Sequence, residues 1–155
     1  MRFSLSRLVT LTILFSAPLS VLAAIPSPAH NALTQAIERS VEWSGHIKTE
    51  VAKGKKLDPT HLRQEIASLK TWLDEMTKTY ADISVKYPYE KDEGHFIAVK
   101  KHQTTATESL KNIEAALEMK DPNYRQMKKL AKRLTAELEL AAREHRSELN
   151  EIEAQ

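Results

Sequence analysis

The chain of 155 residues contains no cysteine and only three glycines. Without cysteine there are no disulfide bonds, no thiolate metal ligands, no lipid-modified cysteine and no covalently attached c-type haem. The scarcity of glycine argues against a glycine-rich phosphate-binding loop and against a fold with many tight turns. Stability must therefore come from the packing of apolar side chains, and strong helix formers such as Ala, Leu, Glu and Lys dominate the composition.

The sequence also lacks an apolar run long enough to cross a membrane, which requires about 20 residues. The apolar stretch near the amino terminus covers only residues 8–15, and Arg2 and Arg7 are the charges beside it. Small residues follow at the positions where a signal peptidase would cut, Ala23 and Ala24. A basic start, a short apolar run and small residues together are typical of a secretory signal peptide.

We therefore predict a signal peptide over residues 1–23, a single domain over residues 24–155, and a periplasmic or secreted location. Removing the two leader arginines reduces the 23 basic residues to 21, which equals the 21 acidic residues. A neutral protein outside the cytoplasm has no general attraction to nucleic acid, so we expect no such partner. We also expect no stable membrane insertion after the signal peptide is cleaved.

Helix starts are marked by a capping side chain followed by proline at Ser27-Pro28, Asp58-Pro59 and Asp121-Pro122. The capping oxygen accepts a free backbone N–H, and proline fits the first helical position because no partner awaits its missing N–H. Asp92 and Glu93 favour a fourth start, since negative charge stabilises a helix amino terminus. Gly54 suits the position just after a helix.

Apolar residues between these marks recur every three or four positions, which is the spacing of one buried helix face. The clearest series is Leu62, Ile66, Leu69, Leu73, Met76, Tyr80, Ile83 and Tyr87. The connections are short, so consecutive helices should lie antiparallel. We predict an all-α, up-down-up-down antiparallel four-helix bundle with helices over residues 28–55, 59–86, 93–119 and 122–153.

Several of the six histidines interrupt these apolar series, and His145 continues the series of the last helix, so its side chain should point inward. His30, His95 and His145 all lie about 25 residues from the two predicted turns near residues 56 and 120, so an antiparallel bundle places them at one height. Asp82 belongs to the same layer. Imidazole and carboxylate groups are ligands for zinc or copper, so we predict a metal site formed by His30, His95, His145 and Asp82.

A haem group is a second interpretation. In size, topology, predicted compartment and the histidine of its last helix, the chain resembles cytochrome b562. The resemblance implies b-type haem held between helices, with His145 as one axial ligand and His102 among the choices for the other. That family uses a methionine near the start of its first helix, whereas this chain has no methionine between residues 2 and 75.

The default expectation is that the histidines are structural and that no cofactor is bound. We find no arrangement of nucleophile, base and acid, and we expect a protein that is not an enzyme. Two functions remain open from the sequence. One is binding of a transition-metal ion, or less favourably haem, at the histidine end. The other is a cofactor-free helical interaction module of the cell envelope, an adaptor, inhibitor or chaperone-like protein with an envelope protein as its partner.

Overall fold

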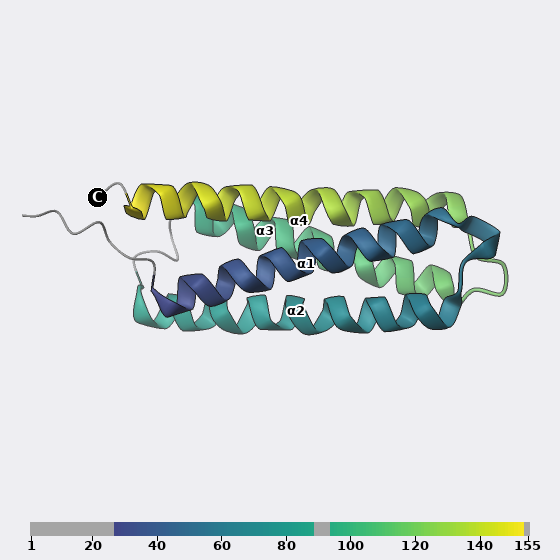
Figure 1. Ribbon diagram of the computed structural model, residues 1–155, viewed down its shortest axis with the longest axis horizontal. Helices are drawn as coiled ribbons and strands as arrows, with labels where there is room; N and C mark the ends of the chain where they lie inside the picture. Colours follow the sequence, from purple (N-terminus) through teal and green to yellow (C-terminus); the bar gives the residue numbers. More distant parts are fainter. Residues whose placement is uncertain (1–26, 89–93, 154–155) are drawn as a thin grey trace, which may run out of the picture.

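A computed structural model describes residues 27–88 and 94–153 of the chain. Within them lie the helices α1 (Pro28–Ala52), α2 (Pro59–Lys86), α3 (Gly94–Leu117) and α4 (Tyr124–Glu153), a short 3₁₀ turn η1 (Gly54–Lys56), and no strand. The four helices lie lengthwise beside one another, with the turns after α1 and α3 at the same end (Figure 1). The predicted all-α, four-helix fold is confirmed at this level. The predicted signal peptide and the start at Asp92 and Glu93 fall outside the described residues.

Two of the predicted helix starts are confirmed in their chemistry. The Ser27 side chain accepts a hydrogen bond from the backbone N–H of His30, and Asp58 accepts from Thr60 and His61. The predicted start at Asp121-Pro122 is wrong, because α4 begins two residues later, at Tyr124.

The side chain of Asn123 performs the capping in α4, with its Oδ1 accepting from the N–H of Gln126 at 3.1 Å. Asparagine caps a helix as well as aspartate does, and Asn123 lies only two residues after Asp121, so the proline at 122 pointed to the wrong capping residue. A hydrogen bond from the Tyr124 N–H to the Pro122 carbonyl, at 3.0 Å, tightens the connection instead. The preceding helix also ends earlier than predicted, at Leu117.

The turn between α1 and α2 depends on Gly54. This residue has a φ angle of +61°, a left-handed conformation that costs a residue with a Cβ atom about 1–2 kcal/mol. The helix ends at Ala52 and not at residue 55, because η1 occupies the residues that follow. The turn brings the last residues of α1 against the first residues of α2.

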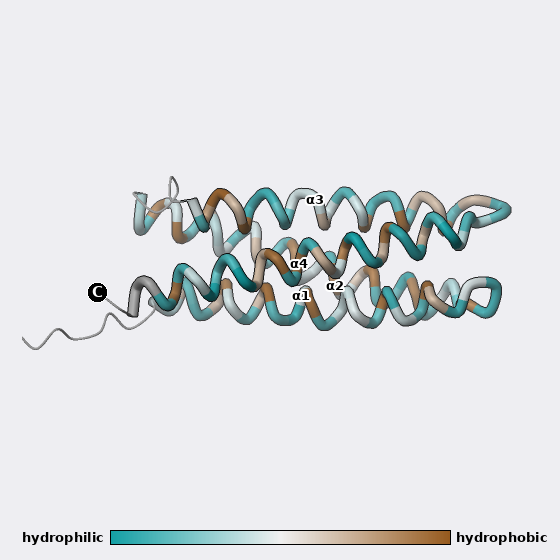
Figure 2. Tube along the Cα trace, turned by 90° about the horizontal axis from the view of Figure 1, so that it is seen from above, coloured by the Kyte–Doolittle hydropathy of each residue, from teal (hydrophilic) through white to brown (hydrophobic). Residues whose placement is uncertain are grey.

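The core consists of the apolar series predicted from the sequence. In α2 the series is buried from Leu62 to Ile83, and Tyr87 at its end is partly buried. In α4 the buried apolar residues are Met127, Ala131, Leu134, Leu138 and Ala141. Hydrophobic and hydrophilic residues alternate along every helix, as expected where each helix buries one face (Figure 2).

The helices do not pack equally well against one another. α3 lies along α4, and α1 lies along both α2 and α4, whereas α2 and α3 make the least contact of these four pairs. The two helical pairs are therefore joined mainly through α1 and α4. Within the described ranges, none of the helices combines the length and the apolar character needed to cross a membrane.

Candidate metal centre

His30 and His145 meet inside the bundle, at the end where α1 begins. Both are buried, with exposed fractions of 3% and 2%, and their rings lie parallel with centroids 6.4 Å apart. His145 Nδ1 lies 2.9 Å from a Glu148 carboxylate oxygen, and its Nε2 lies 3.0 Å from the Thr34 hydroxyl. His30 Nδ1 lies 2.7 Å from the Ser27 hydroxyl. The inward direction predicted for His145 is confirmed, and both of its ring nitrogens have protein partners.

The other residues of the predicted metal site lie apart from this pair. His95 is partly exposed, and its Nδ1 lies 3.1 Å from a Glu144 carboxylate oxygen. Asp82 is exposed on α2. Within the described chain, no three of His30, His95, His145 and Asp82 place donor atoms within 4.8 Å of one another. The structure thus brings together two of the four residues and not the whole predicted ligand set.

The space beside His145 also bears on the haem interpretation. The cavity that His145 lines has a volume of about 50 Å³. Pockets for drug-sized ligands measure about 300–1,000 Å³, so this cavity does not accommodate a porphyrin. The other predicted haem ligand, His102, lies 2.7 Å from a Glu137 carboxylate oxygen.

A different group of metal-binding side chains lies at the opposite end of the bundle. Glu50 near the end of α1, and His61 and Glu65 at the start of α2, place one donor atom each within 4.8 Å of one another. His61 and Glu65 are four residues apart and so lie on the same face of α2. The turn at Gly54 folds α1 back against this face, which brings Glu50 to the other two residues.

Glu50 is held in place by the turn itself. The residue is 2% exposed, and one carboxylate oxygen accepts a hydrogen bond of 2.9 Å from the backbone N–H of Asp58. The other oxygen accepts from the ammonium group of Lys53. The bond from Lys53, and secondarily the bond from Asp58, lowers the pKa of Glu50 below its usual range. Glu50 is therefore ionised and oriented at neutral pH.

Glu65 has the opposite character. It is 5% exposed, and His61 Nε2 lies 3.2 Å from its Oε1. Its Oε2 is buried and has no hydrogen-bond partner within the described residues. Burial raises the pKa of Glu65; the charge of His61 opposes this shift, and the nearby Glu50 carboxylate adds to it. Two buried carboxylates thus lie beside one half-exposed imidazole.

This donor set suits a divalent metal ion. Imidazole nitrogen and carboxylate oxygen both bind zinc, and three protein ligands leave a further coordination position for water or for another molecule. The side chain of His61 is about half exposed, at 52%, so the group is open to solvent on that side. Lys53 is the competing positive charge, because its ammonium group already contacts Glu50.

Part of this site, the pair of His61 and Glu65, could have been predicted from the sequence. The spacing of His61 and Glu65, one turn apart in the first turns of a helix, is compatible with two ligands of one ion. The predicted metal site grouped three histidines with Asp82 by their height in the bundle and did not use the i, i+4 spacing of His61 and Glu65. Glu50 had no comparable signal, because its burial follows from the geometry of the turn.

Comparison of the chain with protein-family models, with curated protein sequences and with solved structures finds no significant match. No relative therefore supplies a function or a set of site residues. The function has to be argued from the side chains and their geometry.

Proposed function

We propose that the protein binds a divalent transition-metal ion through Glu50, His61 and Glu65. The observation that carries the proposal is the buried Glu65 carboxylate, whose Oε2 lacks a hydrogen-bond partner in the described part of the chain. A buried carboxylate without a partner costs free energy, and a second carboxylate nearby adds repulsion. A bound cation removes both costs, because it supplies a ligand bond to Glu65 and screens it from Glu50.

The donor chemistry favours zinc among the metals considered. Carboxylates alone would suit magnesium or calcium, whereas the imidazole of His61 shifts the preference toward zinc or copper. The open side of the site at His61 allows the ion to exchange. A role in holding and passing on metal ions fits this arrangement better than a permanent structural ion, which is usually enclosed by four protein ligands.

The wider proposal is a non-enzymatic, exported metal-binding protein, built as an up-down-up-down antiparallel bundle. The predicted signal peptide supports a periplasmic or secreted location. We propose the ion as cargo that is bound and released, and not as part of a catalytic centre.

The test is a titration of the purified, metal-free protein with Zn²⁺ by calorimetry, and with Co²⁺ by its visible absorption. We expect one ion per chain, and a loss of affinity of at least tenfold in Glu65→Gln. The matched control is Glu148→Gln, which also removes a buried carboxylate paired with a histidine, but at the other end of the bundle. This control should bind Zn²⁺ as the wild type does.

Two results would contradict the proposal. Unchanged affinity in Glu65→Gln combined with a loss in Glu148→Gln would place the ion at the histidine end predicted from the sequence. A blank titration with both metals would remove the metal-binding function and favour the cofactor-free interaction module of the envelope.

A further inference from the structure

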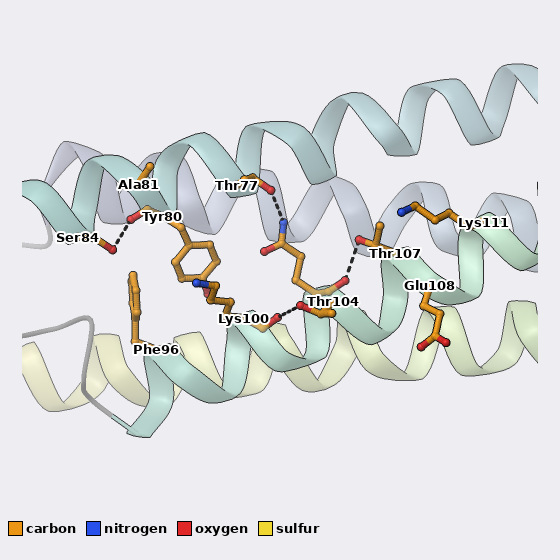
Figure 3. A pocket seen from close by; sticks show the side chains of 11 residues that line it. Thr77, Tyr80, Ala81, Ser84, Phe96, Lys100, Thr104, Thr107, Glu108 and Lys111 are labelled. Atoms are coloured by element: carbon orange, nitrogen blue, oxygen red, sulfur yellow. Dashed lines mark hydrogen bonds between the residues drawn. The ribbon is translucent and has the colours of Figure 1, made fainter.

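The weakly packed pair α2 and α3 borders a groove of about 660 Å³. Its walls include Thr77, Ala81 and Ser84 from α2, and Lys100, Thr104 and Lys111 from α3. Figure 3 shows these side chains along the two facing helices. The volume lies within the range of pockets that hold small molecules, about 300–1,000 Å³. The groove is lined by α2 and α3 alone, and none of the proposed metal ligands lines it.

The walls of this α2–α3 groove are less polar than their composition suggests. The hydroxyl groups of Thr77, Thr104 and Thr107 each donate to a backbone carbonyl four residues earlier in the same helix, and Ser84 does the same. The dashed lines in Figure 3 mark several of these bonds. A threonine whose hydroxyl is bonded to its own helix still offers a methyl group for contact. The groove can therefore hold an apolar chain without leaving these hydroxyl groups unpaired.

One end of the groove is apolar. Its floor there is formed by Tyr80 and Phe96, whose rings meet edge to face with centroids 4.5 Å apart. Val85 follows Ala81 by one helical turn and is 81% exposed, and Ile97 precedes Lys100 by one turn and is 54% exposed. Three large apolar side chains are exposed in the described chain, and these are two of them. Neither residue lines the groove, so the apolar character of this end comes from the rings of Tyr80 and Phe96.

Positive charge lies along the α3 wall. Neither Lys100 nor Lys111 forms an ion pair within residues 27–88 and 94–153, and Glu108 is the acidic residue that lines the groove. The groove therefore offers a surplus of positive charge together with an apolar end. This combination is complementary to a molecule with an apolar body and a negatively charged head.

The dimensions of the groove restrict its occupant. From Phe96 to Lys111 the α3 wall extends about 22 Å, at 1.5 Å per residue. The volume of 660 Å³ is spread over this length, so the groove is elongated. An elongated single-chain molecule matches this shape better than a compact one does.

We propose that the α2–α3 groove binds a single-chain anionic amphiphile of the fatty-carboxylate class. The hydrocarbon chain lies toward the rings of Tyr80 and Phe96, and the carboxylate lies toward Lys111. This site is independent of the proposed metal centre, so either can fail without the other.

The experiment is a calorimetric titration of the purified full chain with dodecanoate, at concentrations below micelle formation. We expect one dodecanoate per chain, and binding at least tenfold weaker for dodecyltrimethylammonium, which has the same chain and the opposite charge. Ala81→Trp should abolish binding by filling the groove. The matched control is Ala136→Trp, which places the same side chain at an exposed position of α4 outside the groove. Lys111→Glu should weaken binding at least tenfold, while Lys129→Glu on α4 should not.

The proposal is overturned if Ala81→Trp binds dodecanoate as the wild type does, or if the cationic amphiphile binds as tightly as the carboxylate. It is also overturned if sedimentation shows a dimer that Ala81→Trp converts to monomer, because the groove would then hold a second copy of the chain. Far-UV circular dichroism checks that the tryptophan variants fold, and Thr104→Trp fills the same groove if Ala81→Trp does not fold. Zn²⁺ binding should be unchanged in every groove variant.

Discussion

Replacing Glu65 with glutamine should change the stability of the protein in opposite directions with and without metal. In the metal-free protein, Glu65 is a buried carboxylate with an unpaired oxygen beside a second carboxylate, that of Glu50. Glutamine has nearly the same shape and no charge. Glu65→Gln therefore removes an unfavourable interaction when no ion is present, and it removes a ligand when an ion is bound.

The magnitude follows from the charge of the buried carboxylate, because glutamine also leaves an unpaired polar atom at this position and removes only the charge. Leaving a buried polar group without a partner costs about 1–3 kcal/mol, and more when the group is charged. We expect metal-free Glu65→Gln to be more stable than the wild type by about 1–3 kcal/mol. At a Zn²⁺ concentration 100 times its dissociation constant, the wild type gains about 2.7 kcal/mol by mass action. With Zn²⁺ bound, the wild type should then be as stable as Glu65→Gln or more stable.

The pH dependence of stability tests whether the buried charge of Glu65 is the cause of this difference. Because burial raises the pKa of Glu65 in the folded protein, the folded state holds a proton over a range of pH in which the unfolded chain has released it. The stability of the wild type therefore falls as pH rises through that range. The advantage of Glu65→Gln should be present at pH 7.5 and absent below the ordinary glutamate pKa of about 4.3, where Glu65 is protonated in both states.

The assay is urea unfolding followed by far-UV circular dichroism, with and without Zn²⁺, at pH 7.5 and pH 3.5. The reasoning fails if metal-free Glu65→Gln is less stable than the wild type at pH 7.5, or if its advantage is the same at both pH values. A stability order that Zn²⁺ leaves untouched would speak against Glu65 as a ligand.

Three further predictions concern the same structure. Lys53→Ala should strengthen Zn²⁺ binding about threefold or more in a calorimetric titration, because the ammonium group that competes for Glu50 is gone; weaker binding would show that Lys53 helps the site. His145→Ala should lower the free energy of unfolding by about 2–4 kcal/mol in urea, because Glu148 loses its buried partner, and it should leave Zn²⁺ affinity unchanged; a loss below 1 kcal/mol would refute this. Asn123→Ala should cost about 0.5–2 kcal/mol in the same assay by removing the cap of α4, and no change would show that the cap contributes nothing.

The sequence was sufficient for the helices and the core because those features depend on local spacing. The three-and-four spacing from Leu62 to Ile83 predicted a buried face, and every member of that series is buried. The inward position of His145 followed from the same periodicity. The start of α4 was predicted wrongly because Asp121 and Asn123 are comparable caps, and local pattern does not decide between them.

The candidate site depends on tertiary geometry that spacing does not encode. Placing His95 at the same height as His145 did not determine how α3 is rotated, and the rotation turns His95 toward Glu144. Burial of Glu50 and Glu65 could not be expected from composition, since charged residues are usually exposed. The fold of the turn at Gly54 brings them together, and that fold is visible only in three dimensions.

The uneven packing of the four helices has a consequence for how the molecule moves. Because α1 and α4 join the two helical pairs while α2 and α3 touch least, individual side chains hold the edge between α2 and α3. Gln103 donates to Leu73 and Thr77 across this edge, and Lys70 contacts Glu114. An opening of the edge would break these few links and leave every helix intact, because the backbone hydrogen bonds of a helix lie within that helix. The amphiphile proposed for the groove would therefore enter without the unfolding of a helix.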